Sequence, residues 1–419
     1  MTAQPYPRGG EYADLILEVG LNLQPGQRLL VAGSTLSGVD IHLAPLVRIV
    51  AERAYARGAR YVDVIWGDPQ LDVAWLTHAS PESFIQYPRW FGGALLEHFK
   101  AGDAFLALYS EDPDLLSGVA PQLVAAALTS MRETVKEARA YIFRNGINWA
   151  VASAPIPAWA AKVLPQLPEP DRHLALWHLI LEACRMTHED PRKAWKAHVD
   201  ELAARAARLT EKKYASLDFS GPGTRLTVGL PFGHIWRGGQ AVAESGIAFL
   251  PNLPTEEVFT LPHRSHVNGV VQATRPFDYG GHTIDGMALV FSQGQVVDFS
   301  ARTGEDTLRE LLHADSGTSR LGEVALVPHS SPVSQLGVVF HNILFDENAS
   351  SHLAFGTAYR FSMKDAEADS DEAFAARGGN QSQVHCDFMI GSATLDVDGI
   401  SSDGERDPIM RAGEWAFQV

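Results

Sequence analysis

Residues 28–33, RLLVAG, form a short apolar run that precedes a longer amphipathic segment. Apolar residues recur at helical spacing from His42 to Ala59, and a second apolar run, YVDVI, follows at 61–65. A buried strand, a helix and another buried strand in this order favour an α/β layer with a largely parallel sheet. Two further strands of this sheet are predicted at Phe105–Tyr109 and Ala140–Phe143.

The second half of the chain has a different pattern. A helical pattern covers Pro170–Tyr214, and short apolar runs separated by glycine-rich turns follow it. Strands are predicted at 226–230, 269–272, 287–291 and 295–299, with a helix at 305–313. We therefore expect an N-terminal α/β domain (residues 1–205) and a strand-rich α+β C-terminal domain (residues 206–419).

Composition and charge exclude several classes of protein. Of the 419 residues, 46% are hydrophobic and 20% are charged, which is typical of a folded protein rather than a disordered one. The net charge of −16 disfavours nucleic acid and anionic membrane surfaces as partners. No uninterrupted apolar stretch is long enough to span a membrane, and the N-terminal residues lack the pattern of a signal peptide. With two distant cysteines, Cys184 and Cys386, the sequence predicts a cytoplasmic protein with reduced thiols.

The clearest local signal for metal binding lies in NQSQVHCDFM, residues 380–389. If this segment is a strand, His385 and Asp387 point to the same face, where an imidazole and a carboxylate can bind one divalent ion. Cys386 then points to the opposite face and is expected to be a packed thiol. The alternative is a hydrogen-bonded pair on the surface.

Other candidate ligands are spread along the second half. His352 lies at the end of a predicted strand within LFDENASSHLAFGTAY (344–359), where a hydrogen-bonded turn is the alternative. Glu257 and Glu323 sit in apolar surroundings, and a buried carboxylate needs a cation or hydrogen-bond donors. Three carboxylates and two imidazoles suit two hard or borderline divalent ions, not a structural zinc. No nucleotide-binding glycine motif is present.

Four blocks resemble the signature segments of the M29 peptidases, the metallo-aminopeptidases of the aminopeptidase T, AmpS and PepS type. These blocks are PNLPTEEVFTLPHR (251–264), RLGEVAL (320–326), LFDENASSHLAFGTAY (344–359) and NQSQVHCDFMIGS (380–392). The resemblance covers nearly the whole chain and keeps the order of the blocks. It implies an enzyme that releases N-terminal amino acids from peptides with two zinc, cobalt or similar ions. It also implies a homodimer in which the N-terminal domain helps to enclose the site.

The resemblance assigns roles to individual residues. Its metal-binding positions fall on Glu257, Glu323, His352, His385 and Asp387. Its active-site tyrosine falls on Tyr359, which can stabilise an oxyanion or ligate a metal. We expect Glu347 to carry the proton to the leaving amine, although it can equally cap a turn beside Asp346.

Two other functions fit the same residues. Two-metal carboxylate–histidine sites also serve phosphoesterases, although no clear cluster of Arg and Lys accompanies the ligand blocks. The second alternative is a non-catalytic binding protein on the same scaffold.

Overall fold

The computed structural model describes residues 5–33 and 38–419, which divide into two compact units. The first unit comprises residues 1–197, 240–255 and 340–344, and the second comprises 198–239, 256–339 and 345–419. The chain therefore passes between the units several times. Among the described residues, no helix is long and apolar enough to cross a membrane.

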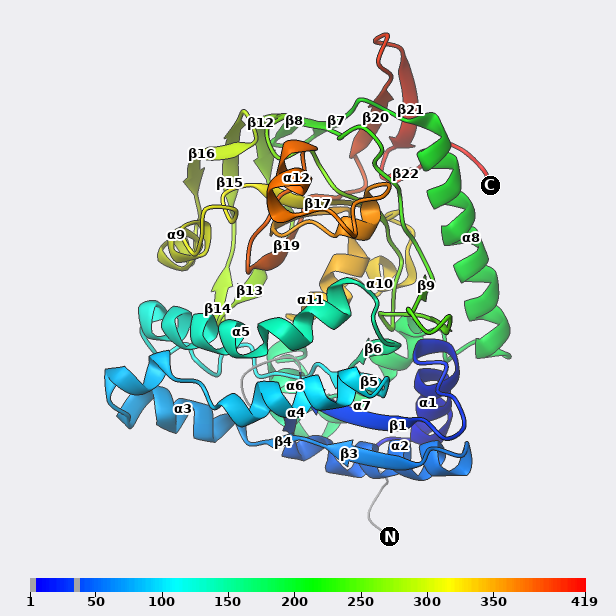
Figure 1. The fold of residues 1–419 in the computed structure, drawn as a ribbon, viewed down its shortest axis with the longest axis vertical. Helices are drawn as coiled ribbons and strands as arrows, with labels where there is room; N and C mark the ends of the chain where they lie inside the picture. Colours follow the sequence, from blue (N-terminus) through cyan, green and yellow to red (C-terminus); the bar gives the residue numbers. More distant parts are fainter. Residues whose placement is uncertain (1–4, 34–37) are drawn as a thin grey trace. The chain divides into compact units, whose positions relative to one another are not determined.

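The first unit is built on a four-stranded parallel sheet in the order β3-β1-β5-β6 (Figure 1). The strands of this sheet are β1 (Arg28–Gly33), β3 (Tyr61–Val64), β5 (Ala104–Leu108) and β6 (Trp149–Ala152). Two separate strand pairs also belong to the unit. One is β2 (Val39–Asp40) with β4 (Trp66–Gly67), and the other is β9 (Ala241–Val242) with β10 (Ala248–Phe249). Its helical segments are α1 (Gly9–Leu15), η1 (Ile16–Gly20), η2 (Ile41–Leu43), α2 (Ala44–Ala56), α3 (Pro69–His78), η3 (Pro81–Ile85), α4 (Arg89–Lys100), α5 (Pro121–Phe143), α6 (Pro157–Val163) and α7 (Glu169–Ala183). The predicted α/β layer with a parallel sheet is confirmed.

The predicted strand at Ala140–Phe143 is wrong, because these residues form the end of α5. Tyr141, Ile142 and Phe143 have high strand propensity, but tertiary packing overrides it. Val135 and Ala138 of α5 are buried against α4, in a cluster that Tyr141 and Ile142 extend. The fourth strand is instead β6, six residues further on.

The second unit is strand-rich, as predicted. An eight-stranded antiparallel sheet has the order β16-β15-β12-β8-β7-β20-β21-β22, and a four-stranded antiparallel sheet has the order β11-β17-β18-β19. The strands of the larger sheet are β7 (Ser216–Gly221), β8 (Thr224–Gly229), β12 (Val267–Gln272), β15 (Ala288–Ser292), β16 (Gln295–Ser300), β20 (Asp396–Ile400), β21 (Arg406–Arg411) and β22 (Glu414–Trp415). Those of the smaller sheet are β11 (Val258–Thr260), β17 (Leu321–Leu326), β18 (His352–Gly356) and β19 (His385–Met389).

The remaining elements of this unit are short. They are the pair β13 (Phe277–Tyr279) and β14 (His282–Ile284), the helices α9 (Glu305–Leu312), α10 (Pro332–Gln335) and α12 (Asp371–Ala376), and the turns η4 (Glu347–Ala349) and η5 (Arg360–Ser362). Two helices contain a boundary between units, namely α8 (Pro191–Lys212) and α11 (Ile343–Asp346).

The two sheets of the second unit differ in burial. Strand β8 alternates buried and exposed residues over most of its length, whereas every residue of β17 and β18 is buried. A strand buried at every position has both faces covered. The smaller sheet is therefore interior, and polar side chains on it must find partners there.

Candidate metal centre

The strand register of the smaller sheet brings four of the sequence-predicted ligands onto one face. Glu323 of β17 and Asp387 of β19 both lie opposite Ala354 of β18. Side chains of directly opposed residues share a face, as do those two residues apart in one strand. His352 is two residues from Ala354, and His385 is two residues from Asp387, so all four side chains project from the same face. The strand predicted around His385 and Asp387 is thus present as β19.

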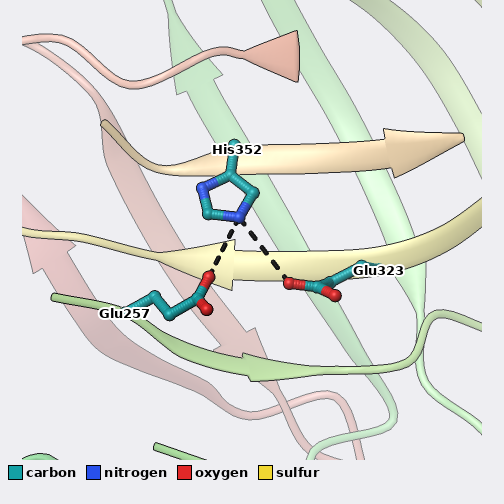
Figure 2. A group of neighbouring side chains, drawn as sticks. All are labelled: Glu257, Glu323 and His352. Carbon is teal, nitrogen blue, oxygen red and sulfur yellow. Dashed lines mark ion pairs between the residues drawn. The ribbon is translucent and has the colours of Figure 1, made fainter. Parts of the chain in front are cut away.

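Glu257 completes the cluster from the neighbouring strand. It directly precedes β11, whose residue Val258 pairs with Leu326 of β17. The Oε2 atom of Glu257 lies 3.1 Å from Nε2 of His352, and Glu323 Oε1 lies 3.6 Å from the same nitrogen. Figure 2 shows the imidazole of His352 pointing between the two carboxylates.

A second set of contacts surrounds His385. Its Nε2 lies 3.4 Å from Glu323 Oε2 and 3.5 Å from Asp387 Oδ1. The described residues therefore contain two groups of three possible ligands, Glu257–Glu323–His352 and Glu323–His385–Asp387. In each group, one ligand atom from every residue lies within 4.8 Å of the others. Glu323 belongs to both groups, through a different oxygen toward each histidine.

Main-chain carbonyls orient both imidazoles. Nδ1 of His352 lies 3.1 Å from the Ser350 carbonyl oxygen, and Nδ1 of His385 lies 3.0 Å from that of Thr357. A proton on Nδ1 satisfies each carbonyl and leaves Nε2 directed at the carboxylates. Metal-binding histidines are oriented in this way.

The charges in the cluster do not balance without a cation. Four buried carboxylates, those of Glu257, Glu323, Glu347 and Asp387, outnumber the two imidazoles. Apart from its ion pair with His352, Glu257 Oε2 has no hydrogen-bond donor among the described residues. A buried excess of negative charge is costly unless cations offset it. The donor set of carboxylate oxygens and imidazole nitrogens fits divalent ions.

Ionisation of the cluster reflects the same imbalance. Burial raises the pKa of Glu257, against the opposing hydrogen bond with His352. Burial alone would also raise the pKa of Glu323, but hydrogen bonds with His352 and His385 lower it to about 2. Burial tends to lower the pKa of His352, yet its carboxylate neighbours raise it well above the usual value. Protons on the imidazoles thus supply positive charge that divalent ions can replace.

Glu347 and Tyr359 border the ligands. Burial, followed by the charges of Asp387 and Glu257, raises the pKa of Glu347 well above its usual value. Burial also raises the pKa of Tyr359, whose ring centroid lies 5.0 Å from that of His385. The phenol of Tyr359 is therefore protonated near neutral pH and can donate a hydrogen bond. The carboxyl of Glu347 binds a proton more readily than an ordinary glutamate does. Glu347 is buried and begins η4.

Asn348 contributes to this arrangement, which its sequence position in a polar loop does not reveal. Its side-chain oxygen accepts a hydrogen bond of 2.7 Å from the main-chain N–H of Glu256, next to Glu257. Its Nδ2 donates to Glu347 Oε1 at 3.3 Å. One fully buried amide thus connects the segment carrying Glu257 to the carboxyl of Glu347.

Cys386 faces away from the ligands, since it alternates with His385 and Asp387 along β19. It is buried, as predicted, and neither Cys386 nor Cys184, which is also buried, forms a disulfide.

The cluster fits a metal-dependent enzyme, and comparisons with known proteins identify the family. Residues 8–415 match the family described as thermophilic metalloprotease (M29), and the chain belongs to this peptidase family. It is 45% identical to aminopeptidase 2 of Geobacillus stearothermophilus over 409 residues, covering 98% of each chain. It is 42% identical to aminopeptidase AmpS of Bacillus subtilis, covering 97% of this chain and 98% of the relative.

A solved structure has the same fold. Wild-type AmpT from Thermus thermophilus superposes with a TM-score of 0.90 at 41% sequence identity, covering 98% of this chain and 99% of that one. The resemblance found in the sequence blocks is therefore confirmed at the level of family and fold.

Proposed function

We propose that this chain is a metallo-aminopeptidase that holds two divalent ions through Glu257, Glu323, His352, His385 and Asp387. The observation that carries the proposal is that Glu323 is shared by two adjacent ligand groups on one buried sheet face. A shared carboxylate is the usual bridge between two ions. The aminopeptidase activity follows from membership of the M29 family, in which the similar proteins are named aminopeptidases.

The ions, zinc or cobalt in this proposal, would supply water activated near neutral pH and polarise the scissile carbonyl. The chain's own residues perform the proton chemistry. Tyr359 stays protonated and donates a hydrogen bond to the oxyanion that develops on the carbonyl. Glu347 accepts the proton that the attacking water releases and passes it to the leaving amine. Its burial and carboxylate neighbours support this role, because they raise the pKa of Glu347 and so strengthen its hold on a proton.

Recognition of a free N-terminus uses groups beside the ions. A carboxylate near the ions can hold the substrate's α-ammonium group, or one ion would ligate the neutral amine. We further propose a cytoplasmic homodimer. Two buried cysteines that form no disulfide support the reducing compartment, and the family resemblance supports the dimer.

A phosphoesterase is less favoured by the surroundings of the site. Arg320, close in sequence to Glu323, donates from Nη1 to the main-chain carbonyls of Arg264 and Gln293, at 2.6 and 3.3 Å. This guanidinium therefore serves the loop structure. Phosphate recognition normally depends on such a group being directed at the substrate.

The test compares reactions and metals in one preparation. Protein purified without chelators is analysed for metal and assayed with amino-acid p-nitroanilides and p-nitrophenyl phosphate, with zinc or cobalt added. We expect two ions per chain and p-nitroanilide hydrolysis that a chelator abolishes. His385→Ala and Asp387→Ala should each abolish that activity in folded protein, whereas Asp403→Ala, in the turn between β20 and β21, should not.

Two results would overturn the proposal. Phosphate ester hydrolysis without peptide release would assign the site to another reaction. Folded protein that hydrolyses neither substrate with any divalent metal would indicate a binding protein.

A further inference from the structure

The segment that leads into His385 is held by a carboxylate outside the ligand set. Oδ1 of Asp315 accepts hydrogen bonds from Gly317 N at 2.8 Å and Thr318 Oγ1 at 3.0 Å. Its Oδ2 accepts hydrogen bonds from Ser382 Oγ and Gln383 N, both at 2.8 Å. Asp315 thus joins the turn before β17 to the residues that directly precede β19.

A second buried group fixes the same segment. Nδ2 of Asn380, a fully buried residue, donates to the carbonyls of Gly317 at 2.8 Å and Gly356 at 2.6 Å. Ser382 Oγ, which donates to Asp315, also accepts from Val384 N at 2.9 Å. Every residue from 380 to 384 except Gln381 therefore takes part in a hydrogen bond of this network.

Close packing prevents the segment from shifting. A Cβ atom on Gly317 would collide with the Gln381 carbonyl oxygen, and one on Gly356 would collide with that of Val384. The main chain of 381–384 therefore lies directly against two glycines. A displacement of the segment must move His385, which is the next residue and pairs with Gly356 across the sheet.

The other ligand group depends on different supports. His352 is oriented by the Ser350 carbonyl, and the segment carrying Glu257 is held by β11 and by Asn348. Neither of these two hydrogen bonds involves Asp315.

We propose that Asp315 is a positioning residue that sets His385 for the Glu323–His385–Asp387 ion and leaves the Glu257–Glu323–His352 ion largely unaffected. The inference rests on the proposed two-ion function and deepens it, because it assigns separate supports to the two ions. Residues that orient metal ligands through hydrogen bonds typically change metal affinity by roughly tenfold to a hundredfold when replaced.

The geometry makes Asp315→Asn an informative substitution. Each carboxylate oxygen faces one main-chain N–H, from Gly317 on one side and Gln383 on the other. In either orientation, the amide NH₂ of asparagine would meet an N–H donor, and neither main-chain donor can turn away. Burial alone would raise the pKa of Asp315, but these hydrogen bonds lower it, so the wild-type group is ionised at working pH.

The experiment measures zinc binding by calorimetry and cobalt binding by visible absorption, on chelator-treated full-length protein. Wild type and the control Asp403→Asn, another turn carboxylate that accepts a serine hydroxyl, should bind two ions. Asp315→Asn should keep one ion at wild-type affinity and bind the second roughly tenfold to a hundredfold more weakly. Excess metal should then restore its peptidase activity. Ser382→Ala removes the two hydrogen bonds of Ser382 Oγ, to Asp315 and from Val384 N. It places no two donors against each other, so it should give a smaller change in the same direction.

The outcomes separate the two proposals. Two ions bound with unchanged affinity in both variants would refute the role of Asp315 and leave the two-ion site intact. Equal weakening of both ions, or activity that excess metal does not restore in a folded variant, would refute its selectivity. Fewer than two ions in wild type would refute the two-ion function itself.

Discussion

Gly356→Ala is predicted to disable the site through the main chain rather than through a ligand. Gly356 ends β18, lies opposite His385 and has φ of +93°, which disfavours a side chain. An added Cβ would collide with the carbonyl of Val384 and lie 3.2 Å from Ser382 Oγ. That carbonyl accepts a hydrogen bond of 2.8 Å from Thr357 N. Relief of the collision must therefore break this bond and displace the residue before His385.

The size of the effect follows from these contacts. Overpacking costs about 1–3 kcal/mol, and loss of the hydrogen bond costs about 1 kcal/mol. Gly404→Ala is the matched control, because Gly404 has φ of +88° and no atom within 4 Å of an added Cβ. Both variants carry the left-handed strain, so the difference between them should be roughly 2–4 kcal/mol.

Urea denaturation and p-nitroanilide hydrolysis measure the two consequences. Gly356→Ala should unfold at lower urea than Gly404→Ala and lose about a hundredfold in kcat/KM, since misplacement of a reacting group by about 1 Å has that effect. Gly404→Ala should keep wild-type activity. Equal unfolding midpoints, or activity of Gly356→Ala within tenfold of the control, would show that the segment tolerates displacement and would refute the reasoning.

Three further predictions test charge and substrate recognition. Glu323→Gln should weaken both ions, because Glu323 belongs to both groups; metal analysis that still finds two tightly bound ions would contradict the shared role. Because the pKa of Glu347 is raised in the folded chain, its protonated carboxyl contributes to the free energy of unfolding at pH values below the ordinary pKa of Glu. This contribution is lost as the pH rises through the raised pKa. Chelated Glu347→Gln, which stays neutral, should therefore gain thermal stability relative to chelated wild type as pH rises above about 4.3, the ordinary pKa of Glu, and a gap that narrows would oppose the assignment. Nα-acetylation of a peptide should lower kcat/KM at least about a hundredfold, or about 2.7 kcal/mol, whereas cleavage of acetylated peptides at internal bonds would exclude an exopeptidase.

The hydrophobic pattern of the sequence predicted strands and helices correctly where one periodicity was clear. Arg28–Gly33 was predicted as a strand and is β1 with the same bounds. The predicted helix at 305–313 is α9, Glu305–Leu312. At Ala140–Phe143, strand propensity favours a strand, but packing of α5 against α4 favours a helix. Contacts between residues far apart in the sequence decide such cases, and a local pattern does not contain them.

The site could be predicted only in part from local sequence. His385 and Asp387 are two residues apart, so a strand suffices to align them. Glu257, Glu323 and His352 lie on separate elements, and their meeting depends on strand pairing that no local pattern encodes. Their polar groups in apolar surroundings made them candidates, family resemblance supported their selection, and their role as ligands stays a prediction. Asp315 and Asn380 gave no signal, because a carboxylate or amide that only accepts or donates hydrogen bonds resembles any other turn residue.

The bulge in β17 shows why pairing, rather than composition, makes this centre. In a regular strand, Leu321 and Glu323 would point to the same face, which would put an apolar side chain beside the ligands. The register shifts between them, so Leu321 pairs with Phe355 while Glu323 pairs with Ala354. Phe355 and Ala354 face opposite sides of β18, so the shift turns Leu321 away from the carboxylate. Gly322 permits the bulge, since a Cβ there would collide with the carbonyls of Gly356 and Thr357. Gly322 thus allows Leu321 to lie on the apolar face of the sheet while Glu323 lies on the face that carries the ligands.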